Sequence, residues 1–180
     1  NIISLIVVGY IWKFILGMGF DSLFDITGLS LFQISWLGDS HMAFWTILLV
    51  SIWQVAGFYT VIYIAGLQSI PEDILEASKI DGAYGFRRFF KVILPMIMPS
   101  VTVCLFTSIL NALKVFEIPF VLTNGGPFNS TTSISMDIYN EAFVNNLYGY
   151  GTAKSVLFFA MIFIFTMMQL RYSKGKEVEL

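Results

Sequence analysis

The sequence contains little charge and very few of the side chains that usually perform catalysis. Only 12% of its 180 residues are charged, against about 25% in typical soluble domains. Cysteine and histidine occur once each, as Cys104 and His41. One cysteine cannot form an internal disulfide, and one histidine far from any cysteine does not make a metal site. No Ser/His/Asp set and no G-x-x-x-x-G-K-[ST] phosphate loop can be assembled, so we expect no catalytic residue, no metal and no ATP hydrolysis in this chain.

Long apolar runs take the place of charge. Hydrophobic residues make up 57% of the chain and the mean hydropathy is +0.77. Four stretches approach the roughly 20 residues that an α-helix needs to cross a bilayer. They lie at about 2–18, 42–67, 94–116 and 152–170. The composition therefore predicts an all-α integral membrane protein with residues 1–180 in one transmembrane domain, and not a soluble or nucleic-acid-binding one.

Basic residues divide unevenly among the connecting segments. Lys and Arg occur in the 68–93 loop and in the tail after residue 170, whereas the 19–41 and 117–151 loops contain none. The positive-inside rule places the first two segments in the cytoplasm and the other two outside. Four alternating spans put both chain ends on one side, which agrees with the charge distribution. Because the chain begins at Asn1 with no signal-peptide features, we expect an N-terminal part to be missing.

The basic loop contains a short predicted helix. Pro71, Glu72 and Asp73 are typical of a helix start, and Gly82 is typical of a left-handed stop. Together they predict a helix over about 71–82, which at about three turns is too short to cross a membrane.

The residue types leave two interpretations of this helix open. Small residues keep part of its surface low, so that another protein can approach closely; they are Ala77, Ser78, Gly82 and Ala83. Alternatively, the helix and the basic amphipathic segment 86–91 only anchor the loop to the membrane surface.

A spaced pattern in the same loop resembles the EAA motif of permease subunits in binding-protein-dependent ABC importers. Its members are Glu76, Ala77, Ser78, Gly82, Val92, Leu94 and Pro95. Ser78 stands where the family usually has Ala, and Val92 where it usually has Ile. The segments 65–83, 114–127 and 155–179 are similar to carbohydrate permeases of the maltose and glycerol-3-phosphate type. The resemblance covers nearly all 180 residues.

The resemblance implies the type I permease core of an ABC importer, with four of six expected transmembrane helices in this chain. It implies that the short helix is a coupling helix, which sits in a groove of a cytoplasmic ATPase and moves with it. The implied coupling residues are Glu76, Ala77, Ser78, Asp81, Gly82, Ala83, Arg87, Leu94 and Pro95. The implied partners are a second permease, two ATPase subunits that bind ATP and Mg, and an external sugar-binding protein. The implied location is a bacterial or archaeal plasma membrane.

Polar residues within the predicted spans are candidates for a transport path, because burying them in lipid is costly. Three of them share a helix face at a spacing of three, and aromatic rings beside a glutamine would suit a sugar. The candidate path comprises Gln54, Phe58, Tyr59, Ser108, Asn111 and Lys114. Helix–helix hydrogen bonding is the alternative, and Lys114 could instead pair with Glu117.

The competing function is a stand-alone secondary transporter or channel. Such a protein would carry charges near the middle of its spans and would need no cytoplasmic docking helix. Mid-span charge is scarce here, with Lys13 the main case. We therefore expect the transmembrane subunit of an ATP-driven importer of a sugar or related solute. The sequence names neither the solute nor the permease of the pair that holds the substrate pocket.

Overall fold

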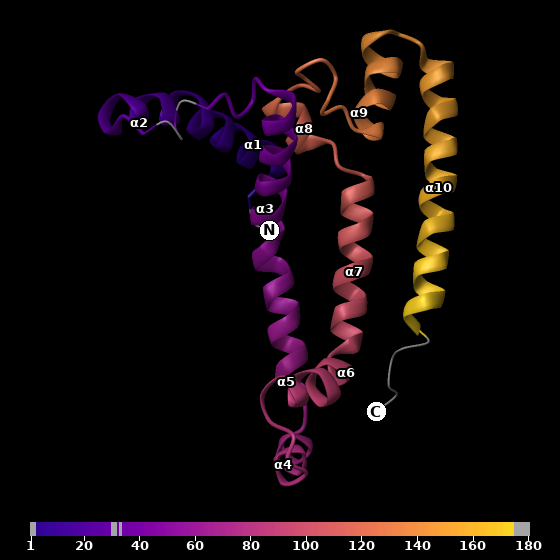
Figure 1. Cartoon of the computed structure of the whole chain (residues 1–180). Helices are drawn as coiled ribbons and strands as arrows, with labels where there is room; N and C mark the ends of the chain where they lie inside the picture. The colour runs from indigo at the N-terminus through magenta and orange to yellow at the C-terminus, as the bar shows by residue number, and fades with distance from the viewer. Residues whose placement is uncertain (1–2, 30–31, 33, 175–180) are drawn as a thin grey trace. The chain divides into compact units, whose positions relative to one another are not determined.

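A computed structural model describes residues 3–29, 32 and 34–174, with side chains up to Arg171 (Figure 1). Every regular element in this part of the chain is helical. The elements, with π-helical turns written η, are α1 (Leu5–Phe14), η1 (Ile15–Gly19), α2 (Phe20–Thr27), α3 (Ser40–Gln68), α4 (Glu72–Ile80), α5 (Gly85–Arg88), η3 (Phe89–Ile93), α6 (Leu94–Met96), α7 (Met98–Leu113), α8 (Glu117–Leu122), α9 (Ile134–Tyr139), η4 (Asn140–Val144) and α10 (Tyr148–Lys174). The predicted basic tail beyond Lys174 lies outside the described residues.

Three helical stretches of the described chain are long and apolar enough to cross a membrane. They are Leu5–Thr27 with 23 residues, Ser40–Gln68 with 29 and Tyr148–Arg171 with 24. Each overlaps a stretch that the sequence indicates as a span. α3 begins where Asp39 accepts hydrogen bonds from the backbone N–H groups of His41 and Met42, at 2.9 and 3.0 Å. This N-cap explains why the helix starts before residue 42.

The first helical stretch continues well past residue 18, where a loop is expected from the sequence. Asp21 and Asp25 lie within α2, and the helix ends only at Gly28, which has a left-handed φ of +66°. The mean hydropathy of the segment falls after residue 18, but polar residues do not end a helix unless the backbone is also interrupted. Gly28 supplies that interruption.

The predicted span at 94–116 has a different shape in the structure. Gly85–Met96 and Met98–Leu113 are two helical stretches that meet at an angle of 72°. The break lies at Ile97, two residues before Pro99. Proline has no N–H to donate to the carbonyl of residue 95, and its ring excludes that carbonyl, so the helix cannot pass straight through this point.

The chain divides into two compact units. The first consists of Asn1–Ala56 and Leu113–Phe159, and the second of Gly57–Ala112 and Ala160–Leu180.

The core of the first unit forms where α1 crosses α3 and packs on α8. Its buried members are Val8, Val50, Ile118 and Leu122. Gly9 permits the close approach, since a Cβ at this position would lie 2.9 Å from the Cβ of Val121. Lys13, the main charge of the first predicted span, donates a hydrogen bond from Nζ to the carbonyl of Val121 at 3.1 Å. The lysine therefore satisfies a carbonyl near the C-terminal end of α8.

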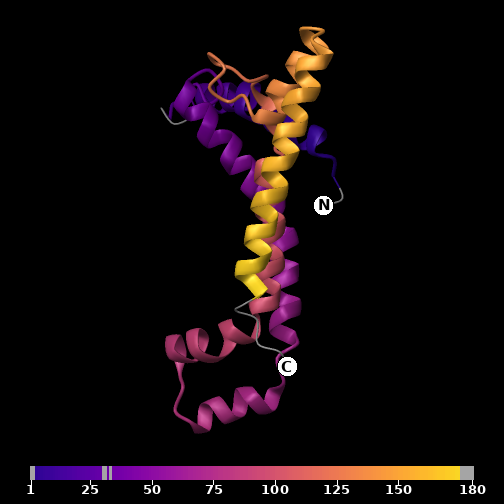
Figure 2. The same ribbon diagram turned by 90° about the vertical axis from the view of Figure 1, so that its right-hand side faces the viewer.

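In the second unit the C-terminal half of α3 packs beside α7. A Cβ on Gly66 would lie 2.9 Å from the Cβ of Ser100 and 3.7 Å from that of Ile97. Beyond the ends of these helices, α4 and the stretch α5–α6 lie one above the other, both across the direction of α7 (Figure 2).

Candidate functional site

The short helix α4 has an outward face with mixed chemistry. Asp73, Glu76, Ala77 and Ile80 follow the i, i+3, i+4, i+7 spacing of one helix face, and all four are exposed. Ile80 is 87% exposed and is not among the coupling residues predicted from the sequence. Its position on the same helix face, three residues after Ala77, would have identified Ile80 as a coupling candidate from the sequence. Carboxylates beside a methyl group and a large apolar side chain suit contact with another protein.

Gly82 ends α4 as the sequence predicts. Its φ is +71°. The N–H of Ala83 donates to the carbonyl of Ser78 at 2.9 Å, and the N–H of Gly82 donates to that of Lys79 at 3.1 Å. These two bonds form a Schellman motif, which satisfies carbonyls that a helix end leaves open. Asp81, at the cap itself, is exposed.

Ser78 was expected to be one of the small surface residues that let another protein approach α4 closely, but it is buried. It is 6% exposed, and its hydroxyl donates to the carbonyl of Leu75 at 2.7 Å. Arg88 donates from Nη2 to the same carbonyl at 3.1 Å. A serine suits this buried position because its hydroxyl has a partner. Ser78 therefore stabilises α4 on its buried side, and Arg88 attaches α4 to α5.

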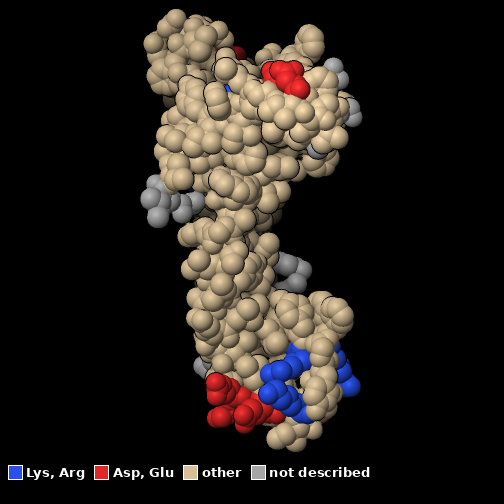
Figure 3. Space-filling model, turned by 90° about the vertical axis from the view of Figure 1, so that its left-hand side faces the viewer, with Lys and Arg blue, Asp and Glu red and all other residues tan. Residues whose placement is uncertain are grey.

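The other predicted coupling residues lie on both sides of this attachment. Arg87 is exposed on α5, Ala83 is half-buried after the cap, and Leu94 and Pro95 are half-buried in α6. Acidic and basic side chains gather side by side on α4 and α5, while the rest of that face carries few charges (Figure 3). The acidic residues are Glu72, Asp73, Glu76 and Asp81, and the basic ones are Lys79, Arg87, Arg88 and Lys91.

The six residues of the predicted substrate path belong to both units. Gln54 and Lys114 lie in the first unit, and the other four lie in the second. The rings of Phe58 and Tyr59 are neighbours, with centroids 5.6 Å apart. Ser108 is half-buried and Asn111 exposed on α7.

Lys114 and Glu117, which the sequence offered as an alternative pair, form no ion pair in the described part of the chain. Within the described residues, both ion pairs involve Lys154. α7 ends at Leu113, and Glu117 begins α8, so a turn separates the two side chains. The spacing of three brings side chains together only on a continuous helix.

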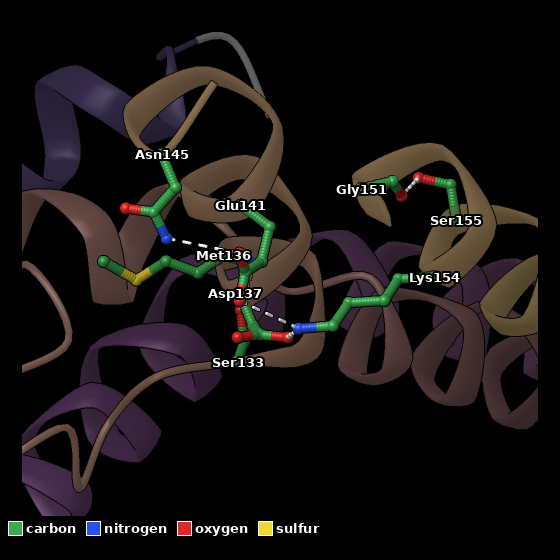
Figure 4. A network of polar contacts seen from close by, with 8 residues as sticks. All are labelled: Ser133, Met136, Asp137, Glu141, Asn145, Gly151, Lys154 and Ser155. Carbon is green, nitrogen blue, oxygen red and sulfur yellow. Dashed lines mark hydrogen bonds and ion pairs between the residues drawn. The ribbon is translucent and has the colours of Figure 1, made fainter. Parts of the chain in front are cut away.

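A polar network joins α9 and η4 to the start of α10 (Figure 4). Nζ of Lys154 lies 2.7 Å from Asp137 and 3.3 Å from Glu141, and Asn145 also donates to Glu141 at 3.2 Å. Ser133 caps α9 by accepting a hydrogen bond from the N–H of Met136.

Thr131 closes the turn that precedes α9: its hydroxyl donates to the carbonyl of Gly126 at 2.7 Å. It lies equally close to the hydroxyl of Thr123. These contacts hold the 123–131 turn closed.

A hollow of about 490 Å³ lies beside this network. Aromatic rings, one valine and three asparagines line it: Phe120, Asn124, Tyr139, Asn140, Val144 and Asn145. No residue of the predicted substrate path is among them. Within the described residues, no group of three or more His, Cys, Asp or Glu side chains is arranged to hold a metal ion.

Known proteins resemble this chain in sequence over most or all of its length. The probable starch degradation products transport system permease protein AmyD of Thermoanaerobacterium thermosulfurigenes is 38% identical over 180 residues, covering 100% of this chain and 61% of AmyD. The trehalose/maltose transport system permease protein MalF of Thermococcus litoralis is 39% identical, covering 88% of this chain and 52% of that protein. The multiple sugar-binding transport system permease protein MsmF of Streptococcus mutans is 35% identical, covering 98% and 61%. The chain thus spans about three fifths or less of these relatives, and the similarity to carbohydrate permeases is confirmed.

Solved structures show the same fold. A bacterial ABC transporter that imports the acidic polysaccharide alginate matches with a TM-score of 0.82 at 23% identity, over 97% of this chain and 62% of the other. The alginate transporter in complex with an alginate pentasaccharide-bound periplasmic protein matches with a TM-score of 0.83 at 23% identity, over 99% of this chain and 63% of the other. The expected all-α permease fold is therefore confirmed. Residues 2–177 match the family described as "Binding-protein-dependent transport system inner membrane component", and the chain belongs to that family.

Proposed function

We propose that this chain is part of the transmembrane subunit of an ATP-driven importer. In this proposal the subunit passes a sugar or related solute from an external binding protein to the cytoplasm. The partners are a second permease, two ATPase subunits that bind ATP and Mg, and the binding protein. The names of the relatives support the carbohydrate substrate, and the basic loop and tail support a cytoplasmic position for α4 and the C-terminus.

The observation that carries the proposal is the construction of α4. A membrane anchor would turn apolar side chains toward lipid, but the outward face of α4 carries Asp73 and Glu76 beside Ile80. This face stands away from α5, because the opposite side of the helix carries Ser78 and the Leu75 carbonyl that binds Arg88. An exposed isoleucine within a charged rim resembles the centre of a small protein interface. We infer that this face docks in a groove of the ATPase.

Co-purification tests the docking. The full-length permease carries an affinity tag and is expressed with its ATPase, and the ratio of ATPase to permease is measured in the eluate. Ile80→Ser and Glu76→Lys are expected to lower this ratio and to reduce ATP-driven uptake in parallel. Phe128→Ser is the matched control, because Phe128 is 97% exposed but lies in the 123–131 turn.

The competing function gives the opposite outcome. A stand-alone secondary transporter would take up its solute without any ATPase, and the α4 variants would transport normally. Normal uptake in Ile80→Ser and Glu76→Lys, at normal levels of permease in the membrane, would refute the coupling role of α4.

A further inference from the structure

The stretch Gly85–Met96, here called the surface helix, is amphipathic. Phe86, Phe89, Phe90 and Ile93 follow the spacing of one helix face. Arg87, Arg88 and Lys91 lie on the other side, and the stretch contains no acidic residue. Phe86 is 85% exposed and Phe90 is 59% exposed. Two exposed phenyl rings on a helix whose opposite face is basic need a partner that can bury the rings and bind the cations.

The direction of the surface helix suits the boundary of a bilayer. It meets α7 at 72°. Since α7 is the apolar part of this bent pair, a bilayer crossed by α7 would have the surface helix lying nearly in its plane. A basic amphipathic helix in this position places its apolar face among the headgroups and upper acyl chains.

The contact with α4 fixes which face is available to the membrane. Arg88 donates to the carbonyl of Leu75 in α4, so the basic side of the surface helix is turned toward α4. The phenyl rings are therefore turned away from α4, toward the level of the spans. Arg87 and Lys91 are exposed and form no ion pair within the described residues. Both have long stems that can bring a charged end to the headgroup level.

We propose that the surface helix is an interfacial element that buries Phe86 and Phe90 in the cytoplasmic leaflet and binds the phosphates of anionic lipid headgroups through Arg87 and Lys91. The occupant of this face is thus the anionic membrane surface. The proposal does not depend on what α4 contacts. It rests on the chain being the membrane protein that its family indicates, and on the cytoplasmic position proposed above for the basic loop.

Site-directed spin labelling of the full-length permease in nanodiscs tests the burial. Single nitroxide labels are placed at positions 86 and 90, and a matched control label at exposed Lys79 in α4. The labels at 86 and 90 are expected to be accessible to oxygen and shielded from a water-soluble nickel relaxation agent, and the label at 79 to show the reverse. Water accessibility at 86 equal to that at 79 would overturn the proposal. Shielding from both agents would also overturn it, since a protein partner would then cover the face.

The lipid selectivity is tested with the same label at position 86. Nanodiscs of phosphatidylcholine alone are titrated with phosphatidylglycerol, and the depth of the label is followed. Each cation near an anionic surface contributes about a fivefold preference, so Arg87→Gln with Lys91→Gln is expected to abolish the response, and Lys79→Gln to preserve it. An unchanged response in the double variant, or no response in the parent protein, would show that the two cations do not bind anionic headgroups.

Discussion

Gly82 allows the structure of α4 to be tested separately from its contacts. Its φ of +71° is a conformation that other L-residues adopt at a cost of about 1–2 kcal/mol. A Cβ built on Gly82 meets no atom within 4 Å, so the cost of Gly82→Ala is conformational and not steric. Since 1.4 kcal/mol is a factor of ten, the two hydrogen bonds of the cap should open roughly 5 to 30 times more often. Asn tolerates the left-handed region and should largely restore the cap.

Hydrogen exchange on the full-length permease measures the cap directly. The peptide containing Gly82 and Ala83 should exchange roughly 5 to 30 times faster in Gly82→Ala, with near-normal exchange in Gly82→Asn. ATP-driven uptake, measured in the same variants, reports on contacts. We expect uptake to fall in both, because Asn adds a side chain to a surface that we propose lies close to the ATPase.

Two results would refute parts of this reasoning. Unchanged exchange in Gly82→Ala would mean that the left-handed cap does not hold the end of α4. Full recovery of uptake in Gly82→Asn, together with normal exchange, would mean that Gly82 serves only as a cap and that no partner approaches it closely.

Three further predictions concern the first unit, each tested on the full-length permease in detergent by thermal unfolding. Lys13→Met removes the hydrogen bond to the end of α8 and should cost about 1 kcal/mol. Gly151→Val should cost about 1–3 kcal/mol, because a Cβ there would lie 2.7 Å from that of Ala142, whereas Gly149→Val is the matched control with no atom within 4 Å. Lys154→Met should lower stability more in low salt than in high salt, since it removes two ion pairs that are only partly buried and are therefore screened by salt. A salt-independent loss would point to packing instead.

Local chemistry allowed the elements around the basic loop to be predicted. The stop at Gly82 follows from the residue itself, because few others adopt its backbone conformation. The start is also local, although Pro71 precedes the helix and is not its first residue. The apolar runs predicted α3 and α10 to within a few residues. These features depend on short-range preferences and on length, which a single sequence contains.

The features that were missed depend on backbone interruptions and on burial. Hydropathy continues smoothly through Ile97, so it does not predict the 72° bend. The bend follows only from the effect of Pro99 on the preceding turn. The same run obscured the end of α7, which separates Lys114 from Glu117. The burial of Ser78 depends on α5 folding back onto α4, and composition alone does not contain that contact.

A coupling helix can transmit a displacement only if its connection to a span is stiff. The 17 residues from Asp81 to Ile97 would be a slack linker if they were disordered. In the structure, the cap at Gly82 and the hydrogen bond from Arg88 to the Leu75 carbonyl restrain the connection at its α4 end. The surface helix then continues to Ile97, which is 5% exposed. Few free dihedral angles remain along this route, so a displacement of α4 by the proposed ATPase would act on the bend and not on a flexible loop. The two proposals are therefore compatible: lipid would hold the surface helix in the membrane plane, and the outward face of α4 would remain available to the ATPase.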